Sequence, residues 1–198
     1  MSRAPIARGT AAILLASALA GCGINSIPTA EENVKARWAD VQNDYQRRAD
    51  LIPNLVATVK AAGAQEKDIL VQVTQARSAA NSVQVSAADL SDPAKMEQYQ
   101  RVQGAVGLSL QRLQEAYPEL KSQANYTTLM SQLEGTENRI TIARRDYNGA
   151  VQAYNTKIRT FPDAVGAKIF YGAKPMVPFA ATTPGAETAP TVNFGNAS

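Results

Sequence analysis

The chain has 198 residues, enough for one domain with a hydrophobic core, and its 20 Lys and Arg against 17 Asp and Glu give a net charge of +3. It contains no histidine, the commonest general base and metal ligand, and only one cysteine. Removing the first 21 residues takes away Arg3 and Arg8, so 18 basic residues remain against 17 acidic ones and the net charge falls to +1. Such a balance is too weak for a nucleic-acid-binding surface, and we expect no nucleic-acid partner.

Residues 1–21 have the layout of a lipoprotein signal peptide. Arg3 and Arg8 form a positive start, and a short apolar run follows at residues 11–20. The run ends in Leu19-Ala20-Gly21-Cys22, which resembles the bacterial lipobox. The resemblance implies cleavage before Cys22, acylation of that residue and stable anchoring by its acyl chains.

Other interpretations of this segment remain open. The apolar run could stay uncleaved and serve as the anchor itself. A buried or redox-active Cys22 is less consistent with the sequence, because no core pattern surrounds it and no second cysteine could resolve it. Either anchor would hold the domain on the periplasmic side of a membrane. Gly23, where an Asp could stand, resembles Gram-negative lipoproteins of the outer membrane, so we expect the outer rather than the inner membrane.

After a linker that ends at residue 29, four long helices are expected, at about residues 30–62, 64–87, 93–117 and 125–161. The seam of the first recurs in steps of three and four, at Val34, Trp38, Val41, Tyr45, Arg48, Ile52, Leu55 and Val59, and Arg48 is its one charged member. Pro53 lies inside this pattern and cannot donate to the carbonyl of Ala49, so we predict a kink within one helix. Asp92 is expected to cap the third helix ahead of Pro93.

Gly104 and Gly107 lie within the third helix, where a close approach of another helix would explain them. Residues 163–179 carry apolar side chains and two prolines, and we expect an extended segment packed on the helices. Residues 180–198 are rich in Ala, Thr, Pro and Gly, typical of a disordered tail. Short connections between long helices favour an all-α fold, an antiparallel bundle of four long helices spanning residues 30–162.

Two stretches of the chain are distinctive. One is RRADLIPNLV at residues 47–56, and the other runs from Glu137-Asn138-Arg139-Ile140 to Phe161-Pro162. With YPELK at residues 117–121 they resemble the LemA family of bacterial membrane-associated proteins, over about residues 30–175. The resemblance implies a bundle of long antiparallel helices behind an N-terminal membrane segment, and no established catalytic activity. The chain departs from the family pattern in its lipobox and in Gln65, where relatives often carry His.

The polar residues of these stretches form the candidate site. They are Arg47, Arg48, Asp50, Pro53, Asn54, Glu137, Asn138, Arg139, Arg144, Arg145, Tyr147, Asn148, Tyr154 and Asn155. Arg48 occupies a core position and needs a partner, for which Asp44 and Glu137 are candidates. The charged residues either form interhelical ion pairs that fix register or line an exposed groove beside Pro53 that recognises a partner. In both cases we predict that residues 137–147 pack beside residues 48–53.

Tyr147-Asn148 and Tyr154-Asn155 are one heptad apart and therefore share a helix face. We expect the rings in the core with paired hydroxyls, and the amides bridging to neighbouring helices. A binding face for a sugar or peptide is the alternative.

The sequence favours neither a catalytic activity nor a metal or cofactor site. Without histidine, catalysis would need a carboxylate pair, for example among Asp44, Asp50 and Glu66, or a Ser-Lys arrangement, and the Glu-x-x-His motifs of metal-binding bundles are absent. We expect a lipid-anchored, non-catalytic envelope protein that binds or scaffolds an envelope protein partner. The alternative is a binding module for a small envelope ligand, such as a peptide, glycan or lipid, in a cleft near Pro53.

Overall fold

The computed structural model of the chain describes residues 25–63 and 67–180, and every regular element in these ranges is helical. The all-α class predicted from the sequence is therefore confirmed for this part of the chain. The expected signal peptide, Cys22 and the tail from residue 181 lie outside the described residues. Within the described residues, no helix combines the length and apolar content needed to cross a membrane.

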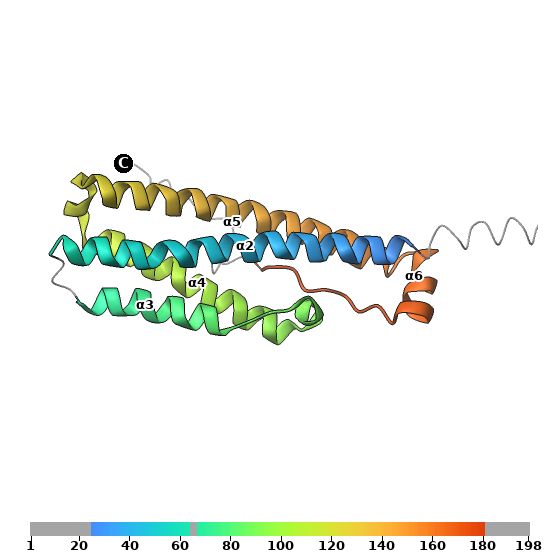
Figure 1. Cartoon of the computed structure of the whole chain (residues 1–198). Coiled ribbons are helices and arrows are strands. Elements are labelled where there is room, and N and C mark those ends of the chain that lie inside the picture. Colours follow the sequence, from blue (N-terminus) through green and yellow to red (C-terminus); the bar gives the residue numbers. More distant parts are fainter. Residues whose placement is uncertain (1–24, 64–66, 181–198) are drawn as a thin grey trace, which may run out of the picture.

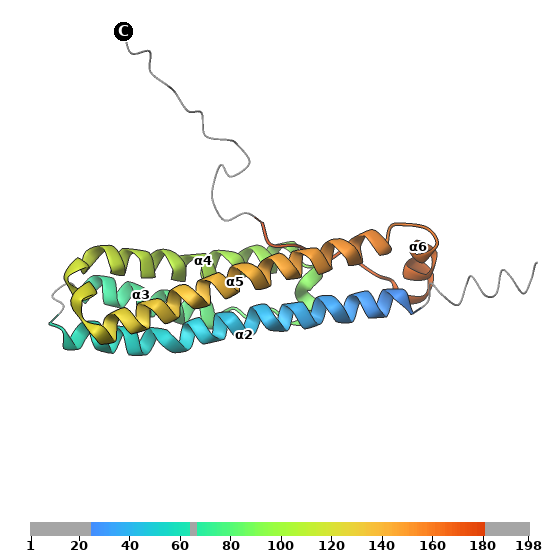
Figure 2. The same ribbon diagram turned by 90° about the horizontal axis from the view of Figure 1, so that it is seen from above.

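Four long helices lie side by side along one axis (Figures 1 and 2). They are α2 (Ser26–Ala61), α3 (Lys67–Ser82), α4 (Pro93–Ala116) and α5 (Ala124–Lys157). Helix α2 packs chiefly against α5, and α3 packs chiefly against α4. The molecule is thus built from two helix pairs, and the facing sides of these pairs enclose the hydrophobic core.

The core is divided into two clusters along the axis. One surrounds Trp38, whose ring lies 5.3 Å from that of Tyr99 and 5.5 Å from that of Tyr147 between centroids. The other contains the aliphatic residues of the far half of α2, among them Ile52 and Leu55. Every apolar seam position predicted for the first helix is buried, because the three-and-four spacing places them on one face.

The start of α4 agrees with the prediction, whereas the end of α3 differs from it. The Asp92 carboxylate accepts hydrogen bonds from the backbone amides of Ala94 and Lys95, at 3.0 and 3.2 Å, so α4 begins where predicted. Helix α3 ends at Ser82, five residues before the expected end. Asn81 and Ser82 are weak helix formers, and beyond them the Trp38 indole donates to the carbonyl of Val85 at 3.1 Å, in residues 83–86 that lie outside the helix.

Helix α2 begins at Ser26 rather than at residue 30 and continues through Pro53. The carbonyl of Ala49, which Pro53 cannot pair, accepts a hydrogen bond from Nε of Arg77 on α3 at 2.7 Å. Pro53 thus creates an acceptor that ties α2 to α3, whereas the kink at this position stays a prediction.

The explanation expected for the glycines of α4 is wrong. A Cβ atom added at Gly104 or Gly107 would meet nothing within 4 Å, so no helix approaches closely there. Their missing side chains leave space beside α4 instead.

Residues 163–171 differ from the extended conformation expected for them. Asp163–Gly166 form the short helix α6, and Ala167–Tyr171 continue it as a π-helical turn. Pro162 precedes the first turn, where its fixed φ favours a helix start, and Gly172 ends the turn with a φ of +53°. Only the residues after Gly172, up to residue 180, are extended, and they run back along the long helices (Figure 1).

Candidate functional site

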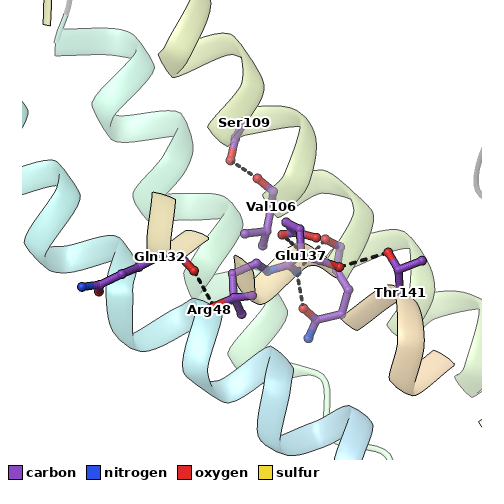
Figure 3. A network of polar contacts seen from close by, with 8 residues as sticks. Arg48, Val106, Ser109, Gln132, Glu137 and Thr141 are labelled. Carbon is purple, nitrogen blue, oxygen red and sulfur yellow. Dashed lines mark hydrogen bonds and ion pairs between the residues drawn. The ribbon is translucent and has the colours of Figure 1, made fainter. Parts of the chain in front are cut away.

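Arg48 is the centre of a polar cluster that separates the two halves of the core. From α2, its Nη1 donates to a carboxylate oxygen of Glu137 on α5 at 2.8 Å (Figure 3). Its Nη2 donates to Gln103 on α4, at 2.9 Å to the backbone carbonyl and 2.7 Å to the side-chain oxygen. One guanidinium therefore joins three helices, which fixes their relative register.

The two charged members of this cluster differ in their exposure to solvent. Arg48 is 3% exposed, whereas the side chain of Glu137 is 43% exposed and reaches solvent. The Arg48 guanidinium also lies 4.9 Å from the ring centre of Tyr45. Burial raises the pKa of the Tyr45 hydroxyl, and the neighbouring arginines only partly offset that effect. The cluster thus holds one buried cation beside neutral tyrosine rings.

Of the two partners considered for Arg48, Glu137 is confirmed. Asp44 lies instead near Arg139, with 3.9 Å between the nearest nitrogen and oxygen atoms. The predicted contact between the two distinctive stretches is thus present at Arg48 and Glu137. It does not extend to Pro53, which is exposed.

A second site is built around residues 172–180, which we call the strap. The Asn148 side chain donates to the carbonyl of Phe179 at 3.0 Å and accepts from its amide at 2.8 Å. Asn155 makes the same pair of bonds to Met176, at 2.8 and 2.9 Å. The Tyr147 hydroxyl donates to the carbonyl of Val177 at 2.9 Å. The amides therefore bridge to the strap and not to neighbouring helices, which corrects the expectation for them.

Geometry explains why two asparagines one heptad apart can hold one extended segment. Seven residues of helix rise about 10.5 Å, and three residues of extended chain span about 10 Å. Asn148 and Asn155 thus match the spacing of Phe179 and Met176. Each amide pairs with both backbone groups of its partner, as a neighbouring strand would.

The end of the strap is held by side chains. The Arg144 guanidinium lies 4.7 Å from the ring centre of Phe179 and donates to the carbonyl of Ala180 at 3.0 Å. The ring of Phe179 in turn stacks on Trp38, with 5.9 Å between centroids. Gln100 on α4 accepts from the amide of Ala180 at 3.0 Å. The strap therefore closes the core over Trp38.

A groove lies between α4 and α5, which make little direct contact with each other. Its volume is about 550 Å³, and its lining residues are Gly107, Leu110, Gln111, Gln114, Met130, Leu133, Glu134, Glu137 and Asn138. We call it the α4–α5 groove. Buried Leu110 and Leu133 form an apolar floor, and exposed Gln111 and Asn138 lie among its polar residues. Glu137 links the groove to Arg48, so one carboxylate serves both.

The sequence model of the LemA family matches residues 37–194. The chain belongs to the LemA family. The match includes both distinctive stretches and the strap. No curated protein matches the sequence of this LemA family chain.

The remaining candidate residues of this LemA family protein are dispersed. Arg47, Asp50 and Asn54 are exposed on α2, and the Asp50 carboxylate accepts from Gln46 on the same helix at 2.7 Å. Arg145 is exposed beside Asp146, at 3.5 Å. Tyr154 is buried, as predicted.

Three contacts of the site were missed by sequence reasoning, those of Arg77, Gln100 and Gln103. Each is one polar residue on a helix rich in similar residues, and its partner lies far away in the sequence. A local pattern does not single it out. Within the described residues, no three His, Cys, Asp or Glu side chains gather closely enough to hold a metal ion.

Proposed function

We propose that this LemA family protein is a lipid-anchored, non-catalytic interaction protein of the cell envelope. In this proposal the four long helices form one antiparallel bundle, and the α4–α5 groove docks an apolar helical segment of an envelope protein partner. The observation that carries the proposal is the groove itself, an open channel with an apolar floor between two helices that make little direct contact with each other.

The chemistry of the groove supports a helical occupant. Leu110 and Leu133 offer apolar surface along two helices, which suits the apolar face of a third helix. Gln111, Gln114 and Asn138 offer uncharged donors and acceptors to its polar flanks. Gly107 adds no side chain, and this lets a partner approach the backbone of α4.

Photo-crosslinking in cells tests this docking site. A photoreactive amino acid at Gln111 should capture a defined envelope protein, whereas the same group at exposed Gln75 on α3 should not. The substitution Gly107→Leu fills the groove and should abolish the adduct at Gln111 while leaving the helical content unchanged. Equal adducts from Gln111 and Gln75, or an adduct that survives Gly107→Leu, would show that the groove is not the docking site.

A small envelope ligand is the second candidate for the same groove. Its volume of about 550 Å³ lies within the range of ligand-binding pockets, roughly 300–1,000 Å³. Native mass spectrometry of the purified protein would detect a bound small molecule by its added mass. Loss of this mass in Gly107→Leu, together with the absence of a protein adduct, would favour the small ligand.

The anchor is tested separately. Cys22→Ala should abolish labelling with a fatty-acid analogue and either release the protein from membranes or trap its precursor. Unchanged labelling of that variant would exclude acylation at Cys22.

A further inference from the structure

A cluster of exposed apolar side chains lies at one end of the molecule, in the segment 157–174 that we call the tip. Its members are Phe161, Val165, Ile169, Phe170 and Tyr171, with exposed fractions of 86%, 50%, 68%, 66% and 41%. The other exposed large apolar residues within the described chain, Val71, Leu108 and Ile142, occur singly on three helices. Several large apolar side chains exposed within one short segment indicate a surface that contacts a partner or a membrane.

Basic residues accompany this apolar cluster. The tip contains Lys157, Arg159, Lys168 and Lys174 against Asp163 alone, a net charge of +3. None of the four cations forms an ion pair within the described part of the chain.

The acidic residues of the nearby second turn of α2 are already paired. Glu31 and Glu32 both contact Lys35, at 2.8 and 2.7 Å. The tip therefore presents uncompensated positive charge around large apolar side chains.

The tip lies at the end of the molecule that the proposed lipid anchor would hold near a membrane. Helix α6 lies at the end of the molecule where α2 begins, opposite the end where α2 stops (Figures 1 and 2). The first described residue, Asn25, is only three positions beyond Cys22, the residue proposed above to carry the lipid. An anchor at Cys22 would hold this same end of the bundle against a bilayer.

We propose that the tip docks onto the surface of an anionic lipid bilayer. The side chains of Phe161, Ile169 and Phe170 enter the interface between headgroups and acyl chains, where aromatic and aliphatic groups leave water. The ammonium and guanidinium groups of the tip contact the lipid phosphates. Apolar insertion together with several cations is the combination that binds anionic membranes, and the two observations are independent of the acylation of Cys22.

A site-specific fluorescence experiment tests the docking on the full chain. Since Cys22 is the only cysteine, Cys22→Ala allows a single new cysteine at Phe170 to carry an environment-sensitive NBD dye. Vesicles of phosphatidylcholine and phosphatidylglycerol at 7:3 should shift the emission of the Phe170→Cys label to the blue and protect it several-fold from iodide quenching. Pure phosphatidylcholine vesicles should give a much smaller effect.

Two sets of variants control the result. The same dye on Leu108→Cys and on Ile142→Cys, which replace exposed apolar residues on α4 and α5, should stay accessible to iodide when vesicles are added. In the Phe170→Cys background, the double change Lys168→Glu and Lys174→Glu should remove most of the shift. Neutralising two such lysines alone is expected to weaken tip binding about 25-fold, at about fivefold per charge.

The proposal is overturned if the label at Phe170 is as accessible to iodide with vesicles as without them. It is also overturned if the labels at Leu108 and Ile142 shift equally. The assay uses purified protein and synthetic lipid, so its outcome does not depend on a protein partner in the α4–α5 groove or on acylation of Cys22. Failure of the tip and failure of the proposed function are therefore separate results.

Discussion

The buried guanidinium of Arg48 allows a sharp test of what holds the long helices together at mid-length. Glu137 supplies the carboxylate paired with it, at 2.8 Å, while Gln103 supplies neutral oxygens. Changing Glu137→Ala leaves a cation that is 3% exposed with neutral acceptors only. We expect this variant to be less stable than the double variant Glu137→Ala with Arg48→Met, which has no cation left.

The magnitudes follow from burial. Removing one partner of a buried ion pair costs about 3–5 kcal/mol. The side chain of Glu137 is 43% exposed, so water can reach the guanidinium once the carboxylate is gone, and about 2–3 kcal/mol is expected. Arg48→Met removes the charge at similar volume, and the double variant then loses chiefly the hydrogen bonding of one guanidinium nitrogen, which Gln103 accepts through two oxygens, at about 1 kcal/mol in all. The second substitution should therefore restore about 1–2 kcal/mol.

Urea unfolding followed by circular dichroism at 222 nm measures these free energies. Glu134→Ala, one turn earlier on α5 and exposed, is the matched control and should change stability by no more than about 0.5 kcal/mol. If Arg48→Met adds to the loss caused by Glu137→Ala instead of relieving it, the cation is not the source of the cost and the reasoning is wrong.

Three further predictions concern other contacts. Asn148→Ala removes two hydrogen bonds to the strap and should speed amide hydrogen exchange in residues 176–180 with little change in α3; equal acceleration in both would contradict a local role. Arg77→Ala removes the hydrogen bond to the carbonyl of Ala49 and should lower the free energy of unfolding in urea by about 1–2 kcal/mol. An unchanged unfolding midpoint would contradict this expectation. Burial raises the pKa of Tyr99 and of Tyr147 above the value of about 10 that both have when unfolded. The native state then keeps protons that the unfolded state loses, so stability should fall by about 1 kcal/mol per tyrosine between pH 10 and 11, and the share of the tyrosinate absorbance at 295 nm that comes from these two residues should appear together with unfolding.

The sequence predicted the buried faces of the helices well because helical periodicity is a local property. Trp38, Ile52 and Tyr147 follow steps of three and four, and all are buried. The start of α4 at Asp92 and Pro93 was also predicted correctly, since a capping side chain acts within one helical turn. Helix α3 ends at Asn81-Ser82, where helical support in the sequence weakens, and the indole of Trp38 on another helix binds the backbone just beyond that end.

The candidate site was predicted only in part, because the sequence shows local patterns but not contacts with distant residues. The unusual position of Arg48 in an apolar seam required a partner, and one of the two proposed carboxylates is that partner. The heptad spacing of Asn148 and Asn155 placed them on one face, but their ligand is the backbone of a segment 21 to 31 residues away. A backbone acceptor has no side-chain signature, so its position could not be found from residue types.

The tip and the α4–α5 groove lie at different positions along α5, and the distance between them limits what the groove could bind. The groove residues of α5 run from Met130 to Asn138, and the tip begins at Lys157. At about 1.5 Å per helical residue, the groove stands about 30–40 Å from the tip. With the tip on a bilayer, the headgroup charges, screened within about 8 Å, would not act on the groove. A partner would then have to present its apolar helix well above the membrane surface, which favours the extramembrane domain of an envelope protein over a membrane-spanning segment.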